Sequence, residues 1–187
     1  MNRIQQLAKT YGQHIATEWQ RTIADSQRVI MIVYHKELER DILAHKDEFN
    51  IATKQANHDW FEVDVAPAFA EWMAASEYRD AYFESPDDLQ LKLESEFTRY
   101  VANKIRAVLD REGVSDNSVV AIFGVAALFG FTRVSEVVKL VEPHIRNRRL
   151  VIFFPGEYDQ HNYRLLDARD GWNYLAAPIT LDSTGLA

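Results

Sequence analysis

Charged and aromatic side chains are concentrated in residues 153–179, around turns rather than along one face of a helix. Arginines and carboxylates can form charge-assisted hydrogen bonds, and arginine, tyrosine and tryptophan dominate the energetics of many interfaces. Two interpretations remain open: a local network that fixes a hairpin, and a surface that contacts a partner. The candidate residues for either role are Arg133, Glu157, Tyr163, Arg164, Asp167, Arg169, Asp170 and Trp172.

A second group of polar residues would suit hydrolytic or metal chemistry. His58, Glu62 and Asp64 share one face of a predicted strand, and two carboxylates with an imidazole could hold a divalent metal. Trp60 interrupts this row, so the polar face of an edge strand is the simpler interpretation. With His35 as a further acid–base candidate, this group keeps a divergent nucleotide or phosphoester hydrolase as the alternative function.

Several catalytic and phosphate-binding motifs are missing from the sequence. No glycine lies between Gly12 and Gly113, so no glycine-rich phosphate loop can follow the first or second predicted strand. The apolar segment 124–130 lacks the lysine and hydroxyl groups of such a loop, and we predict a buried strand exit there. The absence of cysteine excludes disulfides and thiolate zinc sites. We therefore predict neither a cofactor nor a resident metal.

The net charge of −7 disfavours sequence-independent DNA binding, because phosphate backbones repel an acidic protein. The charge is uneven, since residues 133–169 contain seven basic and five acidic residues and the remainder carries −9. This window predicts either a solvated basic face or a surface that docks on an acidic partner. Within it, Arg146, Arg148 and Arg149 leave open a third function, a DNA-contacting accessory module.

Hydrophobic periodicity predicts the elements that must position these residues. An apolar face recurs at three- and four-residue spacing and predicts an N-terminal helix within residues 1–25. An apolar run rich in β-branched residues predicts a central strand at residues 28–34, covered on both faces. Further strands are predicted at residues 60–65, 118–123 and 150–154. The helices predicted between and beside them are residues 36–56, 67–75, 86–113 and 133–145.

The C-terminal segment 150–180 carries two turn signals. Pro155-Gly156 predicts the end of the fourth strand, and residues 169–171 predict a hairpin between strands at 163–168 and 172–179. Alternating strands and helices predict a mostly parallel sheet with helices on both faces and antiparallel C-terminal strands. We expect one three-layer α/β domain over residues 1–187, with a nucleotide-binding-type layout but no phosphate-binding loop.

Two features bear on location. The N-terminus has no apolar core of a signal peptide. The longest apolar run, residues 119–131, is shorter than the roughly 20 residues that span a bilayer. We expect a cytoplasmic protein with no membrane contact.

Two stretches of the sequence resemble the BrxB family of the bacterial BREX antiphage system. One is Leu150–Tyr158 with Asn162–Tyr174, and the other is Leu128–Glu136. The resemblance implies a cytoplasmic defence component whose expected partner is PglZ, the alkaline-phosphatase-like protein of the system, with other BREX proteins as further partners. It transfers no catalytic residue. We expect DNA contact to be only indirect or weak. We therefore predict a non-catalytic interaction or scaffold subunit that binds PglZ.

Overall fold

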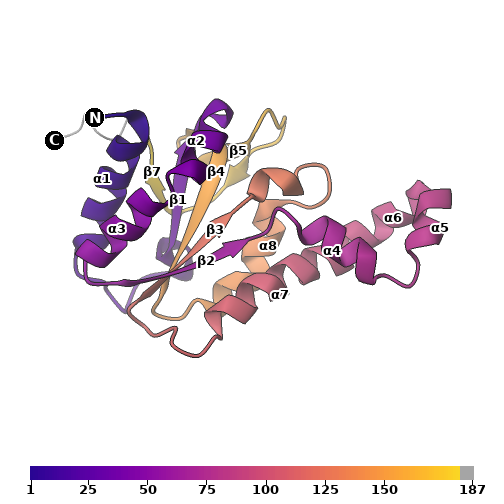
Figure 1. The fold of residues 1–187 in the computed structure, drawn as a ribbon, viewed down its shortest axis with the longest axis horizontal. Helices are drawn as coiled ribbons and strands as arrows, with labels where there is room; N and C mark the ends of the chain where they lie inside the picture. Colours follow the sequence, from indigo (N-terminus) through magenta and orange to yellow (C-terminus); the bar gives the residue numbers. More distant parts are fainter. Residues whose placement is uncertain (182–187) are drawn as a thin grey trace.

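The computed structural model describes residues 1–181, and a seven-stranded sheet organises them (Figure 1). The main path of the sheet runs β2-β3-β4-β1-β7, with every pair parallel, and β5 and β6 attach antiparallel beside β4. The strands are β1 (Val29–Tyr34), β2 (Asp59–Asp64), β3 (Ser118–Phe123), β4 (Arg149–Asp159), β5 (Asn162–Leu165), β6 (Trp172–Asn173) and β7 (Ala177–Ile179). The prediction of a mostly parallel sheet with antiparallel C-terminal strands is confirmed.

Helices cover both faces of the sheet, as predicted (Figure 1). The two that pack on one face are α1 (Arg3–Ala16) and α3 (Asp47–Gln55), and the two on the other are α7 (Thr98–Leu109) and α8 (Val134–Val141). Alternate side chains of β1 enter the two cores, because successive residues of a strand point to opposite faces. Ile30 and Ile32 contact the first layer, whereas Met31 and Val33 contact the second.

A helical arm separates β2 from α7 and extends away from the sheet in Figure 1. It consists of α4 (Ala68–Ala75), α5 (Arg79–Glu84), α6 (Pro86–Lys92) and a π-helical turn (Leu93–Phe97). Aromatic rings fix its base: Phe69 stacks on Phe131 at 4.1 Å and meets Phe97 edge-on at 5.6 Å between ring centroids. The remaining short helices are α2 (Glu39–Ala44) and four 3-10 turns, Asp25–Arg28, Lys36–Leu38, Val125–Leu128 and Glu142–His144.

The N-terminal helix is shorter than predicted. α1 ends at Ala16, and Thr17 is already extended, so the helix does not continue to residue 25. The aromatic residue that seemed to continue its apolar face, Trp19, folds back and donates from Nε1 to the carbonyl oxygen of Ile15 at 3.0 Å. Trp19 therefore lies in a loop that covers the end of the helix, although its spacing in the sequence matches the apolar face of the helix.

Three other predicted helices change at their ends or middle. The helix predicted over 86–113 contains the π-helical turn and ends at Leu109, and Gly113 lies in the turn beyond it. The helix predicted over 36–56 is interrupted between α2 and α3. The helix predicted over 133–145 becomes a 3-10 turn after Val141, where Pro143 cannot donate a backbone hydrogen bond.

The turn signal Pro155-Gly156 does not end a strand, and this prediction is wrong. β4 pairs with β1 up to Pro155 and then continues as the partner of β5 from Gly156 to Asp159. A β-carbon on Gly156 would lie 2.0 Å from the backbone carbonyl oxygen of Arg164. At Pro155-Gly156, β4 therefore changes its pairing partner from β1 to β5. Glycine at position 156 permits the close approach of β5.

The chain after β5 also differs from the predicted hairpin. Tyr163 lies opposite Trp172, so the connection extends from residue 166 to 171 rather than being a tight turn at 169–171. The predicted strand 172–179 divides into β6, which pairs with β5, and β7, which pairs parallel with β1. Within residues 1–181, no helix is long and apolar enough to cross a bilayer.

Candidate functional site: a polar and aromatic groove

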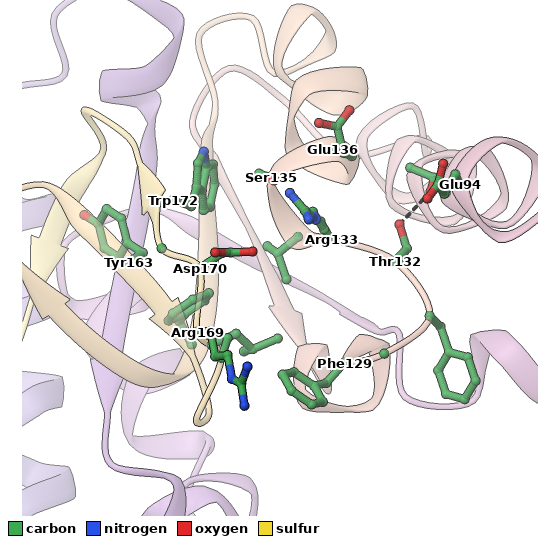
Figure 2. Close-up of a pocket in the computed structure, with 18 of the residues that line it drawn as sticks. Glu94, Phe129, Thr132, Arg133, Ser135, Glu136, Tyr163, Arg169, Asp170 and Trp172 are labelled. Atoms are coloured by element: carbon green, nitrogen blue, oxygen red, sulfur yellow. Dashed lines mark hydrogen bonds between the residues drawn. The ribbon is translucent and has the colours of Figure 1, made fainter. Parts of the chain in front are cut away.

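A groove of about 660 Å³ lies beyond the carboxyl end of the β4 segment that pairs with β1 (Figure 2). One wall is the loop after β3 with the first turn of α8, and the facing wall is the β5–β6 connection. The π-helical turn and the start of α7 close a third side. Because β3 and β4 are parallel neighbours, the segments that follow them meet at the same edge of the sheet.

Five of the eight residues singled out from the sequence line this groove: Arg133, Tyr163, Arg169, Asp170 and Trp172. They come from two stretches that are about 30 residues apart in the chain and that face each other across it. The three other candidates, Glu157, Arg164 and Asp167, lie outside its lining.

The charged side chains of the groove are not paired with one another. Among residues 1–181, the guanidinium groups of Arg133 and Arg169 and the carboxylate of Asp170 form no hydrogen bond or ion pair. Figure 2 shows Asp170 between Trp172 and Arg133, whereas Arg169 points toward the other end of the groove. Both signs of charge are therefore available to an incoming group.

Aromatic rings provide the apolar part of the groove. Phe129 is 48% exposed, and Trp172 packs against Tyr163 and Tyr174 with ring centroids 6.0 and 4.3 Å apart. Tyr163 is buried, which raises the pKa of its hydroxyl, and Figure 2 shows that hydroxyl directed away from Trp172 and Asp170. The Tyr163 ring thus supports Trp172 from behind.

A smaller cavity of about 370 Å³ continues the groove along α8 and shares Ser135, Glu136 and Trp172 with it. At its far end, the Tyr174 hydroxyl donates to the Glu142 carboxylate. Burial raises the pKa of Tyr174, and the bond to Glu142 raises it further. This bond fixes the segment after β6 against α8.

The three candidates outside the groove hold the C-terminal strands. Glu157 and Arg164 are directly opposite across β4 and β5, and Arg164 Nη2 lies 3.2 Å from Glu157 Oε2. Asp167 Oδ2 lies 2.5 Å from Lys36 Nζ, and this hydrogen bond lowers the pKa of Asp167. These three residues therefore pair with residues of neighbouring segments, and a contact role for the five residues in the groove stays a prediction.

The candidate hydrolase residues do not form a site. His58 lies with Nε2 3.1 Å from the carbonyl oxygen of Ile15 and Nδ1 2.7 Å from Asn117 Oδ1. Its ring stacks on Trp19 with centroids 3.7 Å apart. His58 thus joins the end of α1 to the start of β2.

The remaining members of that group have local roles. Glu62 accepts from Lys46 Nζ at 2.8 Å, and Asp64 accepts from the backbone N–H of Ala66 at 2.9 Å. His35 is exposed at the end of β1, in a different part of the sheet. In the part of the chain that the structure describes, no three histidine, aspartate or glutamate side chains are grouped to hold a metal ion.

The arginine cluster considered for DNA contact is not a surface cluster, and that interpretation is wrong. Arg148 is 5% exposed and donates to the carbonyl oxygens of Ile145, Leu109 and His144 at 2.9, 2.5 and 2.7 Å. Arg149 is also buried, which lowers its pKa to about 10, and its guanidinium lies 4.7 Å from the ring centroid of Trp19.

This burial also changes the charge of residues 133–169. Without Arg148 and Arg149, five basic and five acidic residues remain on this part of the surface. The predicted basic face is therefore neutral overall. Of its five remaining basic residues, Arg133 and Arg169 line the groove.

The third wall of the groove was not predicted. Glu94 and Thr98 contribute to it, and the Thr98 hydroxyl lies 2.5 Å from the Thr132 hydroxyl on the facing loop. Nothing in the local pattern distinguishes these two residues from the exposed polar face of a helix. Phe129 carried a weak signal, because it is an aromatic residue in an apolar loop directly after a strand.

The fold and the groove define an open-sheet α/β protein with a mixed-charge, aromatic groove at the carboxyl edge of its sheet. The family model described as BREX protein BrxB matches residues 66–178, more than half of the chain. The chain belongs to the BrxB family and is a component of a BREX antiphage defence system. The matched range contains the arm and every residue that lines the groove. Comparison with curated proteins and with solved structures finds no significant match.

Proposed function

We propose that this chain is a cytoplasmic, non-catalytic interaction subunit of a BREX system and that it binds PglZ through the groove. One observation carries the proposal. Arg133, Arg169 and Asp170 lie without intramolecular partners among residues 1–181, beside the exposed ring of Phe129 and the ring of Trp172. Arginine and tryptophan are the residue types whose removal most often weakens a protein interface.

The chemistry of the groove favours a protein segment as the ligand. Arg133 and Asp170 offer opposite charges on facing walls, so a complementary segment would bring an acidic group to one and a basic or amide group to the other. Aromatic rings beside them would exclude water from such pairs, which strengthens the pairs by lowering the local dielectric. The second cavity continues the groove along α8 and adds about 370 Å³ of space for such a segment.

Replacing both groove arginines, Arg133→Ala with Arg169→Ala, is expected to weaken binding of purified PglZ at least about tenfold, or 1.4 kcal/mol. Each exposed guanidinium would lose a charge-assisted hydrogen bond to the partner without exposing the core. The measurement is a titration of PglZ by calorimetry, together with co-purification from cells. Arg111→Ala is the matched control, because Arg111 is exposed, lies in the turn after α7 and is not part of the groove.

Unchanged PglZ affinity in the folded double variant would refute the groove as the binding site. Failure of the two wild-type proteins to associate at micromolar concentration would refute PglZ as the partner. Binding through these arginines should also weaken as salt rises, because salt screens charge pairs at the rim of an interface.

A further inference from the structure

The outer part of the arm, α5 and α6, contacts little of the rest of the chain. Its anchor is Tyr82 on α5, which is buried and lies with its ring 6.4 Å from that of Trp72 on α4. α6 has no buried residue. In Figure 1 these two helices lie farthest from the sheet, so their outer faces are accessible to another molecule.

Three large apolar side chains are exposed on α5, on α6 and on the residue directly before α5. Tyr78 is 63% exposed, Phe83 73% and Leu91 78%. Isolated exposed apolar residues are common on protein surfaces, but several of them on one projecting element mark a contact surface. The arm therefore presents apolar anchors that its own fold does not use.

α5 and α6, with the residues on either side of them, are strongly acidic. Residues 76–96 contain seven acidic and two basic residues, so they carry −5 of the chain's net charge of −7. Both basic residues already contact acidic neighbours, Arg79 at 3.8 Å from Asp80 and Lys92 at 3.1 Å from Glu96. The carboxylates outside the groove that have no ion pair within residues 1–181 are Glu77, Glu84, Asp87 and Asp88.

We infer that the arm is a second interaction surface, which docks onto a protein partner whose basic residues surround an apolar depression. The apolar side chains of the arm would enter the depression, and its free carboxylates would pair with the surrounding lysines and arginines. Such charge complementarity steers association and selects the partner. This surface is distinct from the groove, and the inference does not depend on PglZ as the partner of the groove.

Charge argues against two other occupants of the arm. A nucleic acid would bring its phosphates against an excess of carboxylates, which repel them. A second copy of this chain carries the same net charge of −7 and the same acidic arm. A basic protein surface would instead attract the carboxylates of the arm.

The test is photo-crosslinking from the arm in cells that contain the complete set of BREX proteins. The full-length chain carries benzoylphenylalanine in place of Phe83, and the crosslinked peptides are identified by mass spectrometry. We expect one BREX protein to be captured, at a segment where lysines or arginines flank apolar residues. The matched control places the same photoreactive residue at Leu43 of α2, which is 42% exposed and lies outside the arm, and we expect it not to capture that segment.

A paired variant tests the role of charge. Glu77→Gln with Glu84→Gln removes two carboxylates that lie outside the first turn of any helix, so the arm should keep its fold. Exposed charge pairs are individually weak, so loss of two of them should lower the crosslink yield by between roughly twofold and thirtyfold. A crosslink only to nucleic acid, only to a second copy of this chain, or to no BREX protein would overturn the inference, as would a yield unchanged by the two substitutions.

The two surfaces can be separated experimentally. A chain with Arg133→Ala and Arg169→Ala should still crosslink from position 83, even where it no longer binds PglZ. Loss of the crosslink in that variant would mean that the arm has no partner of its own and would also overturn the inference.

Discussion

Replacing Gly156 by alanine is expected to lower the free energy of unfolding by about 3 kcal/mol or more. The added β-carbon would lie 2.0 Å from the carbonyl oxygen of Arg164 and 2.9 Å from its carbonyl carbon. Both atoms belong to the backbone of β5, so a side-chain rotation cannot relieve the overlap. β5 must move away from β4, which also displaces Tyr163 and Trp172 from the groove.

Chemical denaturation measures this effect, and Gly113→Ala is the matched control. Gly113 has a φ of +92°, but a β-carbon there meets no atom within 4 Å. That substitution should cost only about 1 kcal/mol of backbone strain. Equal losses for the two variants would contradict the steric explanation, and full PglZ binding by Gly156→Ala would show that the position of β5 does not matter to the groove.

Replacing Arg148 by alanine is expected to destabilise the fold by about 3 kcal/mol. Its buried guanidinium donates to three backbone carbonyl oxygens, those of Leu109 at the end of α7 and of His144 and Ile145 after α8. Carbonyl groups at helix ends lack partners within the helix, so these bonds satisfy acceptors that would otherwise be buried without a donor. Loss of the side chain removes all three donors and leaves a cavity between the two helices.

The control for this prediction is a nearby exposed arginine, Arg146, two residues earlier in the chain. Arg146→Ala removes the same charge from an exposed position with no side-chain hydrogen bond within residues 1–181, so its effect should stay within about 0.5 kcal/mol. Denaturation midpoints at pH 7 compare the two variants. An equally small loss of unfolding free energy for Arg148→Ala and Arg146→Ala would contradict the buried role of Arg148. Contact with an acidic ligand would then again be a candidate role for Arg148.

The difference between these two arginines shows where prediction from the sequence stops. Residues 146–149 read as one basic cluster, because the local pattern does not show which side chains have backbone carbonyl groups within reach. Leu109, which accepts from Arg148, lies 39 residues earlier in the chain. The exposure of a charged residue near the end of a helix depends on such distant contacts.

The same limit explains the errors in the C-terminal segment. Pro155-Gly156 is a reliable turn signal when only neighbouring residues are considered. In the fold, β1 pairs with β4 up to Pro155, and β5 takes over as its partner from Gly156. Pairing with β1 and β5 thus keeps Pro155 and Gly156 in an extended conformation, although their local propensity favours a turn.

The sequence by itself determined the runs that become β1, β2 and β3, the alternation with helices that makes the sheet mostly parallel, and the BrxB family. A strand that is buried on both faces of the sheet needs a continuous apolar run, and such a run can be recognised from neighbouring residues alone. Residues 118–123 are an example. Only the tertiary structure decided that residues 128–136 and 163–172 face each other as a groove, and that Glu157, Arg164 and Asp167 stay outside it. The physical reason is that the groove, like the burial of Arg148, results from contacts between segments far apart in the chain, and the position of each segment depends on the packing of the whole sheet.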